Sequence, residues 1–178
     1  LVSALVVNPL IAFICIRRNP YPLVFKCLKN SGITAFFTRS SAANIPVNME
    51  LCKNLGLDEK NYSTSIPLGA TINMDGTASY QCVATIFLAA CCGMNLTLGQ
   101  MVTVVVTATL ASIGTAGVSG AGMIMLAMVL TAMGIDVNMI MIIYGVDRLF
   151  DMGRTCLNVT GDIAGTLCVT KWEEGELK

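Results

Sequence analysis

Residues 101–135 contain no charged side chain, and this run limits the possible folds more than any other feature of the sequence. A straight α-helix of that length would measure about 52 Å, whereas the hydrocarbon core of a bilayer is roughly 30 Å thick. The centre of the run, SIGTAGVSGAG at 112–122, is dominated by Gly, Ala, Ser and Thr, which interrupt a helix. Each apolar arm beside it is too short to cross a bilayer. The run therefore predicts a re-entrant helical hairpin rather than two complete spans.

The composition of the whole chain is that of a membrane protein. Of its 178 residues, 54% are hydrophobic and 12% are charged, whereas soluble proteins have about 25% charged residues. Lys and Arg are concentrated before residue 61 and absent from 61–147, which places the early loops in the cytoplasm and the loops at 91–100 and 134–138 outside. A net charge of zero gives no indication of a nucleic-acid partner. We expect a multi-pass protein of the cell (plasma or inner) membrane.

Two other features exclude common classes. The chain has no His, and its eight Cys form no C-x-x-C motif, which removes the usual zinc and haem signatures. We interpret the Cys as small apolar packing residues, because adjacent Cys91 and Cys92 are too close for an ordinary disulfide. The opening LVSALVVNPLIAFICI lacks the features of a signal peptide. Residues 1–30 are therefore predicted to be the end of a spanning helix and a cytoplasmic loop.

A single charge, Asp75, lies within NMDGT in the otherwise uncharged segment 66–94. Non-helical backbone at membrane depth is tolerated only where protein or a water-filled cavity satisfies it. We therefore predict a spanning helix over 61–97 that is unwound at 73–77.

A weaker pattern upstream is similar to the hairpin pattern of residues 101–135. The segment NSGITAFFTRSSAANIPVNMELC places a serine-rich tip between weakly apolar arms and predicts a re-entrant hairpin at 31–60. The hairpin at 98–135 is followed by a last helix at 136–172 and a cytoplasmic tail at 173–178. A hairpin followed by a helix with polar residues thus occurs twice. The charges place the two hairpins on opposite sides. The sequence therefore predicts an all-α membrane protein with an inverted repeat, as in secondary transporters.

Five polar residues in DRLFDMGRTCLNVTGD recur at helical spacing. On an α-helix they lie within a band about 80° wide, so they form one face. Ionisable groups inside a membrane are costly unless they face a cavity or a partner, and this face therefore predicts a lined site. Its members are Asp147, Asp151, Arg154, Asn158 and Asp162.

The charges on this face suggest two kinds of ligand. The Arg154 guanidinium can hold a carboxylate by two hydrogen bonds, and Asp151 can receive an ammonium group, which together specify an acidic amino acid. The alternative is that Asp151 and Arg154 pair with each other and only lock helices together. Asp162 and Asp75 have no basic neighbour in sequence and suit a small cation, the alternative being protonated, hydrogen-bonded carboxyl groups.

Four motifs, TRSSAANIPVN, GATINMDGT, SIGTAGVSGAG and DMGRTCLNVTGD, in this order resemble the dicarboxylate/amino acid:cation symporter family, which includes the glutamate and aspartate transporters. The resemblance implies a transport domain of two re-entrant hairpins and two long helices, which moves against a trimeric scaffold of earlier helices. It implies a homotrimer in a lipid bilayer, without enzymatic activity. We expect that these 178 residues do not transport by themselves.

The resemblance also implies roles for individual residues. Those similar to the family's substrate contacts are Ser41, Thr77, Val118, Gly122, Asp151, Arg154, Thr155 and Asn158. For sodium, the coupling ion, the resemblance implies one site from Asp162 with the carbonyl groups of Gly69, Asn73 and Asn158. A second site would use Asp75 and the Asn73 side chain, and a third the backbone of Thr71, Met74, Ser112, Ile113 and Thr115.

Two departures from the family pattern bear on the substrate and on gating. Ala42 stands where many acidic amino acid transporters have Ser, and TRSSAANIPVNM is similar to sodium:serine/threonine symporters. Those symporters lack the equivalents of Asp75 and Arg154, and we therefore favour the acidic type. Ser119 stands where Pro often follows Val, a loss that would make the second hairpin more flexible.

The favoured function is sodium-coupled symport of glutamate or aspartate, with sodium preferred over protons as the coupling ion. The alternatives within the family are a neutral (serine/threonine) or a C4-dicarboxylate symporter. A channel or a membrane scaffold without transport is the alternative from another class.

Overall fold

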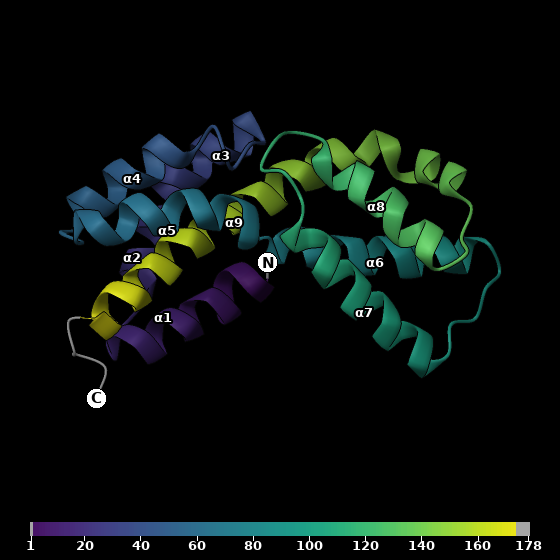
Figure 1. The fold of residues 1–178 in the computed structure, drawn as a ribbon, viewed down its shortest axis with the longest axis horizontal. Helices are drawn as coiled ribbons and strands as arrows, with labels where there is room; N and C mark the ends of the chain where they lie inside the picture. Colours follow the sequence, from purple (N-terminus) through teal and green to yellow (C-terminus); the bar gives the residue numbers. More distant parts are fainter. Residues whose placement is uncertain (1, 174–178) are drawn as a thin grey trace.

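A computed structural model describes residues 2–173, and these residues are helical and contain no strand (Figure 1). A π-helical turn at Ser3–Val7 leads into α1, and further non-α turns lie at Leu28–Gly32 and Val137–Ile140. The α-helices are α1 (Asn8–Ile16), α2 (Tyr21–Cys27), α3 (Ile33–Thr38), α4 (Ile45–Asn54), α5 (Glu59–Ile72), α6 (Asp75–Cys91), α7 (Leu98–Ile113), α8 (Ala121–Ala132) and α9 (Met141–Glu173).

The helices form two groups that share α9, which runs through both (Figure 1). The first group contains α1 to α5, and its core includes Tyr62 and Ile66 of α5 and Ile163 of α9. The second contains α6 to α8, and its core includes Leu88 and Leu126. The middle of α9 therefore lies at the junction of two separately packed cores.

Two helix pairs are joined by non-helical tips, and we name them the first and second hairpins. The first has one arm over 21–38, a tip at 39–44 and α4 as its second arm. The second consists of α7, a tip at 114–120 and α8. The first arm begins at residue 21, ten residues before the predicted segment 31–60. Pro22 lies in the first turn of α2, a position that proline tolerates at the start of a helix.

Local sequence explains several of the helix ends. Thr97 and Gln100 form a capping box that begins α7, and the Asp58 side chain caps α5. Pro46 lies in the first turn of α4, where no backbone N–H donor is needed. Gly120 precedes α8 with a φ of 83°, a conformation that favours glycine.

The interrupted helix is present, but its break is shorter than the predicted segment 73–77. α5 ends at Ile72 and α6 begins at Asp75, so only Asn73 and Met74 have non-helical backbone. The helix restarts early because α9 supplies an acceptor for one of its first N–H groups: Gly76 N donates to Asn158 Oδ1 at 2.9 Å.

A buried polar network joins the first hairpin to α9. Ser31 Oγ donates to Asn48 Oδ1, and Asn44 Nδ2 donates to Ser31 Oγ at 2.6 Å and to Asn48 Oδ1 at 2.9 Å. Asn48 Nδ2 in turn donates to the Val159 carbonyl of α9 at 3.1 Å. These three side chains are at most 2% exposed. Because the Asn44 end lies in the tip, the network fixes the tip against the centre of α9.

Replacing Asn48 with Ala is expected to destabilise the protein by about 3 kcal/mol, because it leaves buried donors and acceptors in the hairpin and on α9 without partners. Thermal unfolding of the detergent-solubilised protein would measure the loss. Asn54→Ala, at the exposed end of the same helix, is the control and should change stability little. Equal unfolding temperatures for the two variants would contradict this role for Asn48.

The cysteines differ in part from the sequence interpretation. Cys15 and Cys168 form a disulfide between α1 and α9, whereas all eight Cys were expected to be packing residues. The pair is 153 residues apart, and no local motif marks it. Cys91 and Cys92 are free and exposed.

Among residues 2–173, no helix combines the length and the apolar character needed to cross a membrane. Of the predicted cytoplasmic tail at 173–178, residues 174–178 lie outside the described residues.

Candidate functional site

The polar face predicted on the last helix is present and buried. Asp147, Asp151, Arg154, Asn158 and Asp162 all lie on α9 and are between 3% and 6% exposed. Burial of four ionisable groups on one helix is costly unless each has a partner or a ligand. Their surroundings therefore indicate what the site can bind.

One cavity, which we name the central cavity, contains all eight residues expected to contact a substrate. The space inside it that water could occupy is about 20 Å³, roughly that of one water molecule, so the cavity is nearly closed in this structure. Its walls come from both tips, from the start of α6 and from α9. The predicted residues that line it are Ser41, Thr77, Val118, Gly122, Asp151, Arg154, Thr155 and Asn158, and Arg39, Met74, Thr115, Ala116 and Gly117 complete the lining.

The two tips meet directly beside the central cavity. Ala42 N and Ser40 Oγ both donate to the Gly117 carbonyl, at 2.9 and 2.8 Å. A Cβ atom on Gly117 would lie 2.7 Å from the Ala70 carbonyl oxygen and 3.1 Å from Ala42 N. Only glycine allows this approach, so Gly117 sets how closely the tips pack.

Arg154 is held by two carboxylates of its own helix. Its Nε and Nη2 lie 3.1 and 2.9 Å from Asp151 Oδ1, and its Nη1 lies 3.1 Å from Asp147 Oδ1. The guanidinium also lies over the Tyr80 ring at 4.5 Å, a cation–π contact. The pairing of Asp151 with Arg154, left open by the sequence, is thus present.

A second arginine, Arg39, also lies near Asp151 at the central cavity. Arg39 Nη1, from the first tip, lies 3.8 Å from Asp151 Oδ2. Two arginines and two aspartates therefore face each other with no net charge. Asp151 Oδ2 and Arg154 Nη2 have no hydrogen bond of good geometry, although both are buried. Asp151 Oδ2 is thus an unused acceptor, and Arg154 Nη2, which carries two N–H groups, keeps one of them beside its ion pair with Asp151 Oδ1.

Asn158 links the cavity to the interrupted helix. Its Nδ2 donates to Thr77 Oγ1 and contacts Met74 Sδ, both at 3.1 Å. Its carbonyl accepts a hydrogen bond of 3.0 Å from Asn73 Nδ2. Asn158 is therefore fixed by residues on both sides of the helix break.

Three of the four residues predicted for the first sodium site, all but Asn158, line a second cavity, which we name the side cavity. Gly69, Asn73 and Asp162 line it, between α5 and α9. Asp162 Oδ1 is buried without a hydrogen bond, and a Cβ atom on Gly69 would overlap it. A buried carboxylate oxygen without a hydrogen bond is a donor of the hard-oxygen kind that small cations prefer.

The other predicted sodium ligands are brought together less completely. Asp75 Oδ1 is buried without a hydrogen bond. Met74 and Thr115 both line the central cavity, and Ser112 is buried, whereas Thr71 and the Ile113 side chain are exposed. α5 and α7 nevertheless contact each other.

Three further residues contribute to the site without having been assigned a role from the sequence. Asp147 could have been paired with Arg154 because the two are seven residues, or two turns, apart on one face. Arg39 carries the only charge of the first tip, and Tyr80 follows Thr77 by three residues. No sequence feature indicates that the last two contact α9.

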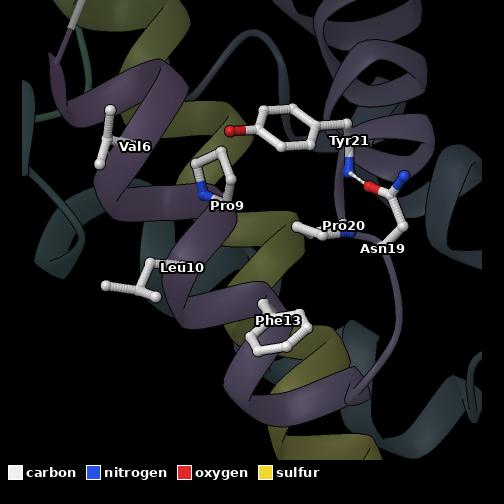
Figure 2. Close-up of a pocket in the computed structure, with 7 residues that line it drawn as sticks. All are labelled: Val6, Pro9, Leu10, Phe13, Asn19, Pro20 and Tyr21. Atoms are coloured by element: carbon white, nitrogen blue, oxygen red, sulfur yellow. Dashed lines mark hydrogen bonds between the residues drawn. The ribbon is translucent and has the colours of Figure 1, made fainter.

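An open groove at the start of the chain has a different character (Figure 2). Val6, Pro9, Leu10 and Phe13 form one wall, and Tyr21 faces them with its N–H donated to Asn19 Oδ1 at 3.1 Å. None of its lining residues is charged. It lacks the convergent polar groups that orient a small ligand.

A small charged cavity where two helical hairpins meet an interrupted helix is the construction of secondary transporters, which bind solutes beside discontinuous helices. Comparison with known proteins gives the family. The model of the sodium:dicarboxylate symporter family matches residues 1–172, and the chain belongs to this family. The proteins of this family are named as symporters, a class of transport proteins.

The chain is similar to the serine/threonine transporter SstT of Bifidobacterium adolescentis, with 46% identity over 167 residues. The alignment covers 92% of this chain and 39% of the relative. The chain therefore spans about two fifths of the length of this relative.

Proposed function

We propose that the chain is the substrate-binding core of a sodium-coupled symporter for small neutral amino acids of the serine/threonine type. The observation that supports this most is that the Arg154 guanidinium is already paired with two aspartates of its own helix. Asp151 Oδ1 lies at the Nε and Nη2 edge of its guanidinium, and Asp147 Oδ1 lies at Nη1. A substrate carboxylate therefore finds no free two-bond fork, whereas a hydroxyl group needs a single donor.

The charge balance supports the same substrate class. A neutral amino acid enters as a zwitterion and leaves the two arginines and two aspartates of the cavity balanced. An acidic amino acid would add one negative charge in a buried site, where an uncompensated charge is costly. The name of the SstT relative points the same way and favours this alternative over the acidic interpretation of the motifs.

The available atoms suggest how the substrate is held. Asp151 Oδ2 would accept hydrogen bonds from the ammonium group, and Arg154 Nη2 would donate to the side-chain hydroxyl. The backbone of the tips, at Ser41 and Val118, would hold the carboxylate. Thr77, Gly122, Thr155 and Asn158 would line the remaining wall.

Sodium is proposed as the driving ion, and Asn158 as the link to the substrate. An ion at Asp162 with the carbonyls of Gly69, Asn73 and Asn158 would sit on the far side of Asn158 from the central cavity. Ion binding would hold the backbone of Asn158 in place. The Asn158 side chain lines the central cavity, so the ion would also fix a group beside the substrate. Additional ions at Asp75 and at the ends of α5 and α7 would act in the same way.

The arrangement in the membrane is proposed from the family. In the complete protein, both hairpins would be re-entrant, and this core would move against a trimeric scaffold in the cell membrane. The contact between the tips supports a gating role for the hairpins, because separating the tips would open the central cavity.

The second candidate substrate is an acidic amino acid, and the position of Arg154 in the cavity wall favours it. Asp147 holds the guanidinium through Nη1 alone. If Asp147 turned away, Nη1 and Nη2 would form a free fork for a distal carboxylate.

Asp147→Asn is expected to shift selectivity toward aspartate by about tenfold, because it removes the negative charge that pairs with Arg154 Nη1 and leaves the charged groups at the cavity with a net positive charge. Inhibition of threonine uptake by aspartate would measure the shift. Asp136→Asn, an exposed cap on the loop before α9, is the matched control and should leave selectivity unchanged. Unchanged selectivity in Asp147→Asn would remove the proposed role of this carboxylate.

Calorimetric titration of the purified complete protein tests the proposed substrate and ion together. We expect L-threonine and L-serine to release heat of binding only when sodium is present. Tighter binding of L-aspartate than of L-threonine would instead support the second candidate, and binding indifferent to sodium would remove the coupling.

A further inference from the structure

We propose that the cation site at Asp162 exchanges ions through a mouth of its own, the side cavity, instead of through the central cavity. This inference rests on the proposed sodium-coupled function. The side cavity lies between α5 and α9 and has about 220 Å³ of space that water could occupy. It shares no lining residue with the central cavity.

The inner end of the side cavity is closed around the buried carboxylate. Asp162 is 5% exposed, and its Oδ1 has no hydrogen bond. Gly161 also closes this end, because a Cβ atom there would lie 2.6 Å from Asn73 Nδ2. The Asn73 amide in turn donates to the Asn158 carbonyl at 3.0 Å. This hydrogen bond forms a contact between the two cavities.

Two hydroxyl groups also line the side cavity, and Ser65 is the one nearer the surface. Ser65 Oγ and Thr166 Oγ1 lie 2.8 Å apart; Ser65 is half-buried, whereas Thr166 is only 2% exposed. Ser65 lies one turn before Gly69 on α5, and Thr166 lies one turn after Asp162 on α9. Hydroxyl oxygens can replace part of the water shell of a small cation. An ion leaving the carboxylate would therefore meet two oxygen ligands before it reaches the surface.

Gly165, next to Thr166 on α9, also lines the side cavity and leaves space there. Gly165 is exposed, and a Cβ atom on it would meet no other group within 4 Å. Side chains added at Gly165 would occupy the mouth without displacing a neighbour. The position therefore allows the mouth to be narrowed without altering Asp162 or its partners.

The test uses the complete transporter in proteoliposomes on a solid-supported membrane. A jump in sodium concentration without amino acid would displace charge, and the relaxation gives the rate of sodium binding. Gly165→Val is expected to slow this rate by about tenfold and to leave the half-saturating sodium concentration within about twofold, because a narrowed path raises the barrier for entry and exit alike. Gly145→Val, on the same helix with open space around it, should change neither quantity.

A second variant keeps the test decisive if Gly165→Val does not fold. Ser65→Val removes one hydroxyl and fills the mouth from α5, and it should slow sodium binding similarly, whereas exposed Ser63→Val should not. Wild-type rates in the folded mouth variants would overturn the inference, as would a loss of sodium affinity without a change in rate. A wild-type transporter that shows no response to sodium would instead refute the proposed function.

Discussion

Replacing Arg154 with Met is expected to reduce amino-acid uptake by at least about two orders of magnitude and to lower stability. The change leaves buried Asp147 without its cation and Asp151 with only the 3.8 Å contact to Arg39, and breaking a buried ion pair in this way costs about 3–5 kcal/mol. Uptake of radiolabelled threonine by proteoliposomes and thermal unfolding would measure the two effects.

Two companion variants separate charge from side-chain size. Arg148→Met changes the exposed arginine that directly follows Asp147, the first residue of the polar face, and it should leave uptake and stability near wild type. Adding Asp147→Asn to Arg154→Met removes one of the unpaired charges and should recover part of the lost stability. An Arg154→Met protein as active and as stable as wild type would contradict the central place given to this side chain.

Gly117→Ala is expected to weaken amino-acid binding by at least about tenfold, because its new methyl group forces the two tips apart. The added Cβ atom would lie 2.7 Å from the Ala70 carbonyl oxygen and 3.1 Å from Ala42 N, and both are backbone atoms that cannot rotate away. Loss of the hydrogen bonds from Ala42 and Ser40 to the Gly117 carbonyl would follow. Titration with L-threonine at saturating sodium would measure the change.

Gly114→Ala provides a control within the same tip. Its Cβ atom would make only ordinary contacts, 3.8 Å from the Ala111 carbonyl oxygen and 3.9 Å from Met125 Cε. Its affinity should therefore be close to that of wild type. Equal weakening in both variants would mean that any change in the tip disturbs binding, and the specific contact at Gly117 would lose its support.

The polar face of α9 was predictable because helical spacing alone places its residues together. Asp147, Asp151, Arg154, Asn158 and Asp162 are all buried as expected. The eight motif residues also gather at one cavity, although their part in binding stays a prediction. Helical periodicity and the order of the motifs were thus enough to predict the polar face and eight of the residues that line the central cavity.

The sequence did not determine which charges neutralise each other. Arg154 considered alone predicts a ligand carboxylate, but in the structure Asp147 and Asp151 occupy its hydrogen-bonding edges. Arg39 reaches Asp151 from a hairpin more than a hundred residues earlier in the chain. Such contacts depend on tertiary packing, and they favour a neutral substrate where the sequence motifs alone favour an acidic one.

The exact bounds of the helix break and the disulfide could not be predicted from sequence patterns. The helix break is limited to Asn73 and Met74 because Gly76 finds its acceptor on α9. The disulfide between Cys15 and Cys168 joins segments 153 residues apart, and neither Cys lies in a recognisable motif. Each feature depends on a partner that is remote in sequence.

Competitive uptake by the complete protein in proteoliposomes tests the central claim most directly. With an inward sodium gradient, we expect saturable accumulation of radiolabelled L-threonine that excess L-serine suppresses and excess L-aspartate does not. Replacing the gradient with equal sodium on both sides should abolish accumulation. Uptake that aspartate suppresses more strongly than serine, or that persists without the sodium gradient, would contradict a sodium-driven symporter of neutral amino acids.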